Sequence, residues 1–144
     1  MLYRRMEERD IDKVAALENA CFSQPWSADA FRKTLENPDI VYMIVEDGEN
    51  IIANGGLRDI VGEGEITNVA VAKEYRGQGI ATKLMTCILE CGDKMGITAY
   101  TLEVRAGNIP AIRLYEHHGF RTEGVRRNFY SNPVEDAYIM WKRV

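Results

Sequence analysis

Residues 69–91 constrain the fold more than any other part of this 144-residue sequence, because three different patterns follow one another there. The segment 69–71 is apolar and rich in valine, and the loop that follows contains Gly77 and Gly79. Between Ile80 and Cys91, apolar residues recur at the spacing of a helix face. The sequence therefore predicts a strand, a short glycine-bearing loop and a helix, in that order.

Such a turn can bind an anion. Glycine lets the backbone approach a phosphate closely, and the free N–H groups of a helix's first turn lie at the positive end of its dipole. A pyrophosphate would fit this arrangement. The residues alone leave open a tight turn that needs glycine only for its backbone angles.

Two other phosphate-binding motifs can be tested against the same residues. A dinucleotide-binding fingerprint requires Gly or Ala three residues after Gly79, where Thr82 stands. A nucleotide-binding P-loop ends in Gly-Lys-Ser/Thr, whereas this loop continues Gly79-Ile80-Ala81. Both motifs are excluded.

The rest of the chain alternates between helical and strand patterns. Asp10, Ser27 and Asn108 stand where N-caps are expected, and Gly119 stands just past the end of a predicted helix. Asp47-Gly48 predicts a hairpin turn. The predicted strands are 2–6, 40–46, 51–60, 65–71, 99–104, 120–128 and 136–142; the predicted helices begin after residues 10, 27, 79 and 108, giving the order βααβββαβαββ.

Length and composition indicate a single domain over residues 1–144. No apolar run is long enough to span a membrane, and the first residues lack the pattern of a secretory signal. We therefore expect a cytoplasmic protein that makes no contact with membranes. The net charge of −4 gives no footprint for nucleic acid, and the oligomeric state stays open between a monomer and a weak dimer.

Cys21, Cys87 and Cys91 are an odd number of cysteines, which favours reduced thiols. Cys87 and Cys91 would share a helix face, but no second ligand pair accompanies them at zinc-like spacing. We expect thiols packed in the core and no bound metal.

Two sequence blocks carry a resemblance to a known family. The pattern Arg76-x-x-Gly79-x-Ala81 after a strand resembles the coenzyme A pyrophosphate loop of the GNAT family of N-acetyltransferases. Residues 108–120 match the Asn-x-x-Ala-x-x-Leu-Tyr-x-x-x-Gly-Phe pattern of the same family. The resemblance implies an α/β fold with a mixed, mostly antiparallel sheet of about seven strands and about four helices.

A closer resemblance is to the family's ribosomal-protein alanine N-acetyltransferases. It is carried by Pro25-Trp26-Ser27, by residues 102–105 (Leu-Glu-Val-Arg), by residues 126–130 (Arg-Arg-Asn-Phe-Tyr) and by Glu135-Asp136-Ala137. It implies transfer of acetyl from acetyl-CoA to the N-terminal amine of a small-subunit ribosomal protein.

The resemblance also assigns roles in a direct transfer that needs no metal. Glu103 would be the general base and Tyr115 the acid that protonates the departing thiolate. A backbone N–H near Val71 would stabilise the developing oxyanion. The residues implied in coenzyme binding are Val69, Ala70, Val71, Arg76, Gly77, Gln78, Gly79, Ile80, Ala81, Thr82 and Asn108.

Each role has an ordinary structural alternative. Glu103 lies on the opposite face of its strand from Leu102 and Val104, where an exposed glutamate is common. Tyr115 stands about two helical turns after Asn108, so both can face the coenzyme, but a packed tyrosine and a helix cap would show the same spacing.

Three functions remain open. The first is N-terminal acetylation. The others are acetylation of lysine or a small amine on the same fold, and an acyl-CoA-binding module without turnover, against which the pair of Glu103 and Tyr115 weighs. Trp26, Tyr130 and the Arg126-Arg127 pair are candidates for the acceptor side, with structural or solvated roles as alternatives.

Overall fold

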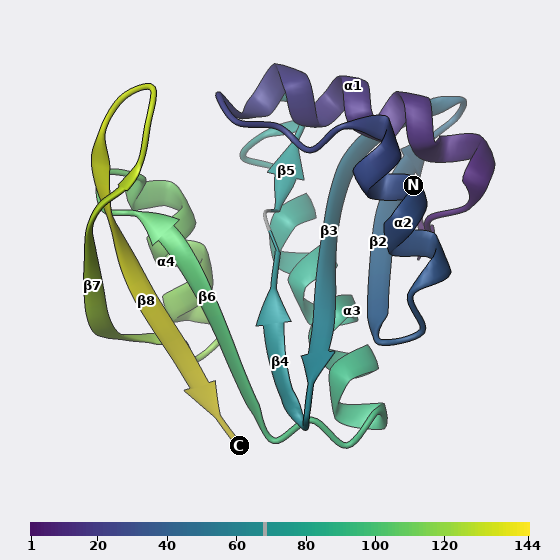
Figure 1. The fold of residues 1–144 in the computed structure, drawn as a ribbon. Helices are drawn as coiled ribbons and strands as arrows, with labels where there is room; N and C mark the ends of the chain where they lie inside the picture. Colours follow the sequence, from purple (N-terminus) through teal and green to yellow (C-terminus); the bar gives the residue numbers. More distant parts are fainter. Residues whose placement is uncertain (68) are drawn as a thin grey trace.

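The computed structural model describes residues 1–67 and 69–144 of the chain. Within them the chain forms four α-helices and eight strands, joined by two short 3₁₀ turns (Figure 1). The helices are α1 (Ile11–Cys21), α2 (Ala28–Glu36), α3 (Ile80–Lys94) and α4 (Ile109–His117). The strands are β1 (Leu2–Arg5), β2 (Ile40–Asp47), β3 (Asn50–Ile60), β4 (Glu63–Ile66), β5 (Ala70–Val71), β6 (Ala99–Arg105), β7 (Arg121–Tyr130) and β8 (Glu135–Arg143).

The strands form one mixed sheet in the order β1-β2-β3-β4-β6-β8-β7, and β5 pairs with β3. Every pairing is antiparallel except that between β4 and β6. The predicted α/β fold with a mostly antiparallel sheet and four helices is confirmed. None of the described helices is long and apolar enough to cross a membrane.

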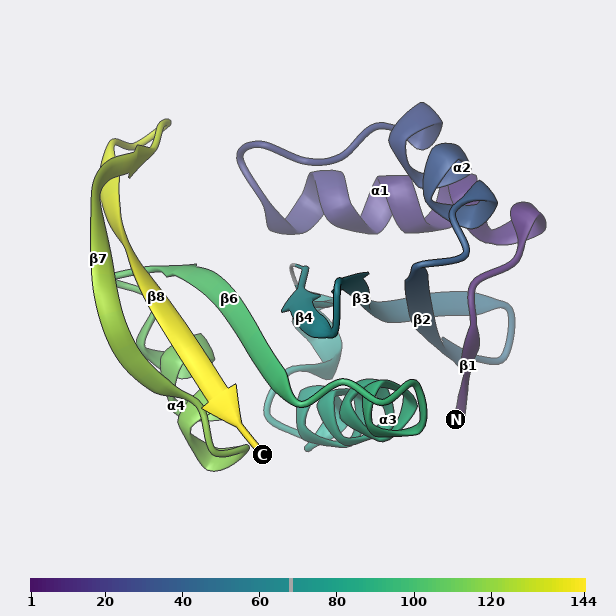
Figure 2. The ribbon, with the colours of Figure 1, turned by 60° about the horizontal axis from the view of Figure 1, so that its bottom comes forward.

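The apolar run on β2 is buried because helices cover both faces of this half of the sheet. Val41, Met43 and Val45 point into a core shared with α3, whereas Tyr42 and Ile44 point into a second core beneath α1 and α2. Figure 2 shows α1 and α2 on one side of the sheet and α3 and α4 on the other. A strand buried on both faces has no polar alternation, which explains the unbroken run.

The predicted strand 65–71 is divided in the structure into β4 and β5, and Asn68 between them lies outside the described residues. Ile66 pairs with Leu57 and Ala70 with Asn54, so the register between β3 and its partner strands shifts by one residue from β4 to β5. An extra residue on one strand is a β-bulge, which bends that strand. Gly56 is required opposite the bulge, because a Cβ there would lie 2.5 Å from the Tyr42 ring.

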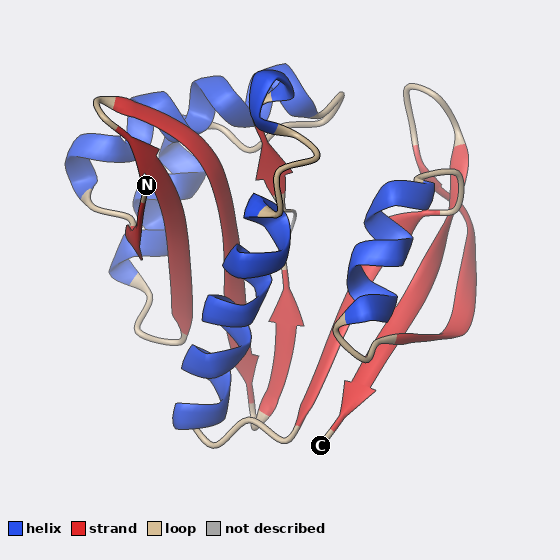
Figure 3. Ribbon diagram, turned by 180° about the vertical axis from the view of Figure 1, so that it is seen from behind, coloured by secondary structure: helices blue, strands red, loops and turns tan. Residues whose placement is uncertain are grey.

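The bend separates the two halves of the sheet. β4 and β6 pair only from Glu63–Ala99 to Glu65–Thr101, after which β5 continues along β3 and β6 turns away with β8 (Figures 1 and 3). Among the described strands, β5 is therefore paired only with β3, and the last residues of β6 are paired only with β8, so the edges that these two strands turn toward each other are unpaired. The candidate site lies at this divergence.

Two of the predicted caps form as expected. The Ser27 hydroxyl accepts a hydrogen bond from the Ala30 N–H, and the Asn108 side chain accepts one from the Ala111 N–H. Gly119 adopts φ +94° just after α4. Asp10 precedes α1 but makes no side-chain cap to it; both carboxylate oxygens are bound by Arg4 instead.

Candidate active site

Two adjoining cavities occupy the space where β5 and β6 diverge. The larger, of about 670 Å³, lies between β5, the first turn of α3 and one side of α4. The smaller, of about 120 Å³, lies between the end of β6, the loop after α1 and the end of β7. Both are lined by the same five residues at their junction: Phe22, Val69, Asn108, Ala111 and Tyr115.

The first turn of α3 forms one wall of the larger cavity. Gly77 and Gly79 have φ values of +77° and +79°, a region that glycine enters without steric cost. No side chain caps the helix, so the N–H groups at its start have no side-chain partner. Ile80, Ala81 and Thr82 line the cavity at this point. The start of α3 thus has the glycine turn and the uncapped first turn on which the prediction of an anion cradle depends.

Two arginines and a histidine line the larger cavity near the start of α3. Arg76 lines the cavity from the loop, and Arg113 and His117 line it from α4. Arg76 is held by its own hydrogen bond from Nε to the Val71 carbonyl, at 3.0 Å. A helix N-terminus and two guanidinium groups around one cavity favour an anionic ligand.

The free edge of β5 supplies backbone donors. The Ala72 N–H donates to the Ile52 carbonyl on β3, at 2.8 Å. Successive N–H groups on a strand point in opposite directions, so the N–H of Val71 points away from β3 and toward the cavity. An extended ligand chain can thus pair with β5 as an added strand would.

Nearly all of the residues predicted to bind the coenzyme lie in the wall of the larger cavity. The exception is Gln78, which is not among the lining residues and whose side-chain amide donates to the Glu74 carbonyl instead. The lining residues from the predicted set are Val69, Ala70, Val71, Arg76, Gly77, Gly79, Ile80, Ala81, Thr82 and Asn108.

Tyr115 stands where the two cavities meet. It lies on α4, with only 6% of the residue exposed, and its ring packs edge-on against Phe120. Burial is the main cause that raises the pKa of its hydroxyl well above the usual value, with a smaller contribution from Tyr130. The Tyr115 hydroxyl is therefore neutral at physiological pH.

Glu103 lies in the smaller cavity, on the face of β6 opposite Leu102 and Val104, as the alternation predicts. Its Oε2 atom is buried, accepts no hydrogen bond from the described residues, and lies 3.6 Å from Nε of Arg126. A carboxylate whose oxygen is enclosed and unbonded can accept a proton from a group entering the cavity. The structure thus brings Glu103 and Tyr115 to the same small cavity.

The candidates for the acceptor side separate into two groups. Tyr130 lines the smaller cavity and Arg126 lies against Glu103. Trp26 instead packs its ring against Phe31 in the core beneath α1 and α2, at 5.5 Å between ring centroids. Arg127 is exposed.

Sequence reasoning missed the contribution of α1 and of the loop after it. Cys21 and Phe22 line the larger cavity, although neither was among the predicted site residues. Its sulfur lies 3.7 Å from the Val71 carbonyl oxygen, far away in sequence. No local pattern could show that the end of α1 meets β5.

His118 joins the two helices that border the larger cavity. Its Nδ1 lies 2.9 Å from the Leu114 carbonyl oxygen and its Nε2 lies 3.1 Å from the Thr82 carbonyl oxygen. The end of α4 is thus fixed to the first turn of α3. His118 therefore has a positional role.

Comparison with known proteins gives one consistent result. The sequence model of the Acetyltransferase (GNAT) family matches residues 11–120. A Bacillus subtilis protein provisionally named [ribosomal protein bS18]-alanine N-acetyltransferase is 36% identical over 139 residues, which cover 96% of this chain and 92% of that protein. The [ribosomal protein bS18]-alanine N-acetyltransferase of Escherichia coli K12 is 30% identical, over 94% of this chain and 92% of its own.

A solved structure agrees with these sequence relatives. The crystal structure of the ribosomal-protein-S18-alanine N-acetyltransferase from Escherichia coli superimposes with a TM-score of 0.90 at 28% identity. The superposition covers 99% of this chain and 93% of that one.

Proposed function

Because the chain belongs to the acetyltransferase (GNAT) family, we propose that it transfers acetyl from acetyl-CoA to the N-terminal α-amine of a small-subunit ribosomal protein, at an alanine. Residues 1–144 act as one domain in this proposal, and the substrate implies a cytoplasmic site of action. The observation that carries it is the meeting of two unlike cavities at Tyr115. The walls of the larger cavity suit an anionic, extended ligand, and the smaller cavity contains the carboxylate of Glu103.

The larger cavity fits acetyl-CoA. The uncapped start of α3, with Gly77 and Gly79, holds the pyrophosphate, and Arg76 and Arg113 balance its charge. The free edge of β5 pairs with the amides of the pantetheine arm, and Asn108 lies beside it. Bound acetyl-CoA supplies an acetyl thioester as the electrophile and coenzyme A as the leaving thiolate.

Glu103 and Tyr115 then move two protons in opposite directions. Glu103 accepts a proton from the amine nitrogen, directly or through water, as the nitrogen forms its bond to the acetyl carbon. Tyr115 donates its hydroxyl proton to the sulfur as the carbon–sulfur bond breaks. The Val71 N–H donates a hydrogen bond to the thioester oxygen as negative charge develops on it. No acetylated residue of the protein is formed.

An α-amine suits a carboxylate base better than a lysine amine does. The pKa of a peptide α-amine is about 8 and that of lysine about 10.4, so the α-amine is neutral far more often near pH 7. This difference in pKa favours N-terminal acetylation over the lysine alternative.

The test compares two peptides that differ only in which amine is free. Coenzyme A release is measured with the protein, acetyl-CoA and a peptide with a free N-terminal alanine, beside a twin whose N-terminus is blocked and which contains a lysine. We expect release with the free N-terminus alone. Release with the blocked twin would indicate a lysine acetyltransferase, and release with neither would contradict peptide acetylation.

A further inference from the structure

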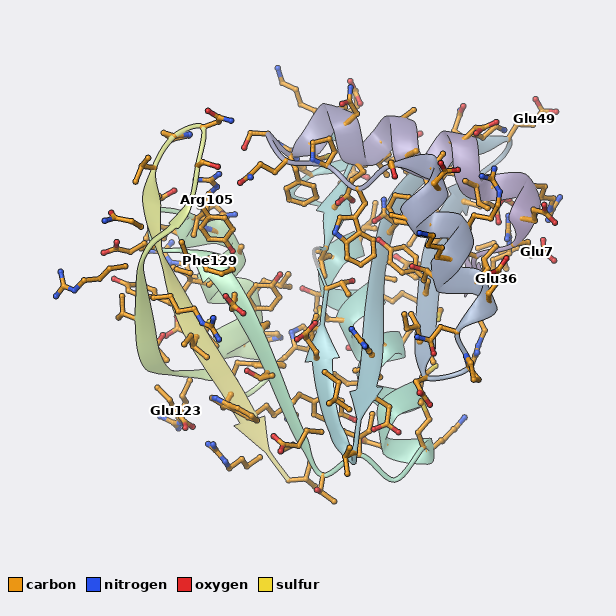
Figure 4. The ribbon with its side chains drawn as sticks, viewed as in Figure 1. Glu7, Glu36, Glu49, Arg105, Glu123 and Phe129 are labelled. Carbon is orange, nitrogen blue, oxygen red and sulfur yellow. The ribbon has the colours of Figure 1, made fainter. Side chains whose placement is uncertain are left out.

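Arg105 lies at the end of β6, two residues after Glu103 and on the same face of the strand. Its guanidinium stacks on the ring of Tyr130, 4.4 Å from the ring centroid. Figure 4 shows Arg105 beside the hairpin that joins β7 to β8. At 2.9 to 3.2 Å it donates to the carbonyl oxygens of Ser131 and Pro133, to the Glu135 carboxylate and to the Ser23 hydroxyl.

These contacts join three segments that are far apart in sequence. Ser131 and Pro133 belong to the turn of the β7–β8 hairpin, Ser23 belongs to the α1–α2 loop (residues 22–27), and Arg105 ends β6. A second bond connects the same turn and loop, because the Ser131 N–H donates to the Gln24 side chain at 3.4 Å. The hairpin turn and the α1–α2 loop are thereby linked across the end of β6.

The linked segments are the walls of the smaller cavity. Ser23 and Gln24 line it from the loop, Tyr130 from the hairpin, and Arg105 from β6. Glu135 in turn fixes the guanidinium of Arg105. One of its carboxylate oxygens accepts a hydrogen bond from Arg105, and the other accepts one from the Gly107 N–H at 2.7 Å. The shape of this cavity therefore depends on one side chain.

We propose that Arg105 is the positioning residue for the acceptor: it fixes the hairpin turn, Tyr130 and the α1–α2 loop around the smaller cavity, so that the incoming amine meets Glu103. The proposal rests on the proposed function, because it takes that cavity as the acceptor site. Arg105 itself moves no proton. Its contacts are saturated by the protein, and it acts through the segments that it holds.

The chemistry of the side chain is specific to arginine. A planar guanidinium presents five donors in a fixed fork and stacks on an aromatic ring at the same time. Lysine keeps the charge but offers one compact group that cannot reach two carbonyl oxygens, a carboxylate and a hydroxyl together. Arg105→Lys therefore separates the positioning role from the charge.

The experiment measures steady-state constants for Arg105→Lys and Arg105→Gln with the N-terminal alanine peptide. We expect the acceptor KM to rise about tenfold or more, as loss of hydrogen bonds to a charged group predicts, with the KM for acetyl-CoA changed less than about twofold. Arg143→Gln is the matched control, because Arg143 also stacks on a ring (Trp141) and pairs with a carboxylate (Glu123), on β8 away from both cavities. It should leave both constants unchanged.

Three results would overturn the proposal. An acceptor KM equal to that of the wild type in a folded Arg105→Lys variant would remove the positioning role. Equal rises in both KM values would indicate a general loss of structure. Additive effects of Arg105→Gln and Ser23→Ala in a double-mutant cycle would show that the two residues do not act through their contact.

A failure of the proposed function would be recognised separately, since the wild-type protein would then release no coenzyme A with the alanine peptide. Amide hydrogen exchange would in that case test whether Arg105 links the hairpin turn to the α1–α2 loop. Arg105→Gln must speed exchange of the Gly107 amide, because its acceptor Glu135 loses the contact with Arg105, and of the Ser131 amide, because Ser131 and the loop that contains its acceptor Gln24 are no longer held by Arg105. Arg143→Gln should leave both unchanged. Unchanged exchange in Arg105→Gln would refute the link.

Discussion

Glu103 and Tyr115 line the same small cavity but lie in different surroundings. Burial keeps the Tyr115 hydroxyl neutral by raising its pKa. Glu103 lies beside Arg126, with its Oε2 atom 3.6 Å from Nε of the guanidinium. The proposed roles of Tyr115 as acid and Glu103 as base can each be tested at a single residue.

Replacing Tyr115 by phenylalanine removes the proton donor and leaves the ring that packs on Phe120. We expect kcat to fall on the order of a hundredfold, with the Kd for acetyl-CoA unchanged. Because the pKa of Tyr115 is raised, the wild-type kcat should not decline through tyrosine ionisation between about pH 7 and pH 10. Tyr3→Phe, on β1, is the control. An unchanged kcat in Tyr115→Phe would remove Tyr115 from the acid role.

Replacing Glu103 by glutamine removes the base and keeps the side chain's size. We expect kcat/KM to be low near pH 7 and to recover as the pH rises past the α-amine pKa of about 8, because the amine then enters the cavity already neutral. The pH profile between about pH 6 and pH 9.5 measures this shift. Glu123→Gln on β7 is the control, and a profile identical to the wild type would indicate water or another base.

At the scale of elements, the features that were predicted correctly from the sequence are those that depend on residues close together in the chain. The order of strands and helices, the caps Ser27 and Asn108, and the strand, loop and helix of residues 69–91 are all local patterns. The bulge between β4 and β5 was not predicted, because a period-two pattern does not show which residues of β3 stand opposite.

Contacts between distant segments were equally hidden in the candidate site. The approach of Phe22 to the cavities depends on how α1 packs across the sheet, which has no signature in neighbouring residues. The Arg-containing stretch 102–105 carried a family resemblance, but only the fold shows that Arg105 contacts Ser23 and the β7–β8 turn.

The start of α3 allows a test with a built-in control. Gly79 and Gly96 lie just before and just after the helix, both have positive φ (+79° and +84°), and a Cβ at either would meet nothing within 4 Å. Alanine at either should lower the free energy of unfolding by about 1 to 2 kcal/mol, since the left-handed region is unfavourable for it. Only Gly79→Ala should also raise the Kd for acetyl-CoA, by about tenfold, because it disturbs the anion cradle.

Urea unfolding and calorimetric titration measure the two effects. Equal losses of stability with unequal losses of coenzyme affinity would support the cradle. If both variants bound acetyl-CoA as tightly as the wild type, the pyrophosphate would have to lie elsewhere in the cavity.

The whole molecule consists of two half-sheets with unequal cover. Helices pack on both faces of the half that contains β2 and β3, whereas α4 lies on the same face as α3 over the half formed by β6, β8 and β7 (Figures 2 and 3). The halves are joined by the short pairing of β4 with β6 and by the continuous core beneath α3. The cavities open where the pairing of β4 with β6 stops, so the candidate site lies between the two halves rather than within either of them.

The doubly covered half is fixed at its outer edge by an ion-pair network that links β1, the turn before α1, and β2. Arg4 binds both carboxylate oxygens of Asp10 at 2.8 Å and the Glu46 carboxylate at 2.8 Å. The hydrogen bonds from Arg4 are the main cause that lowers the pKa of Asp10 below its usual value near 3.8. Asp10 is almost fully buried, so replacing it leaves the Arg4 charge without its main partner.

Asp10→Asn should therefore lower the free energy of unfolding by about 2 kcal/mol at pH 7. A carboxyl whose folded-state pKa is lowered stabilises the protein fully above its unfolded pKa and loses that contribution as the pH falls through the folded value. The stability difference between wild type and Asp10→Asn should thus be constant from neutral pH down to about pH 4 and shrink below it. Urea unfolding at stepped pH measures it, with the exposed Asp12→Asn as control. A difference that persists undiminished well below pH 4 would mean that Asp10 stabilises the fold by shape and neutral hydrogen bonds rather than by its charge.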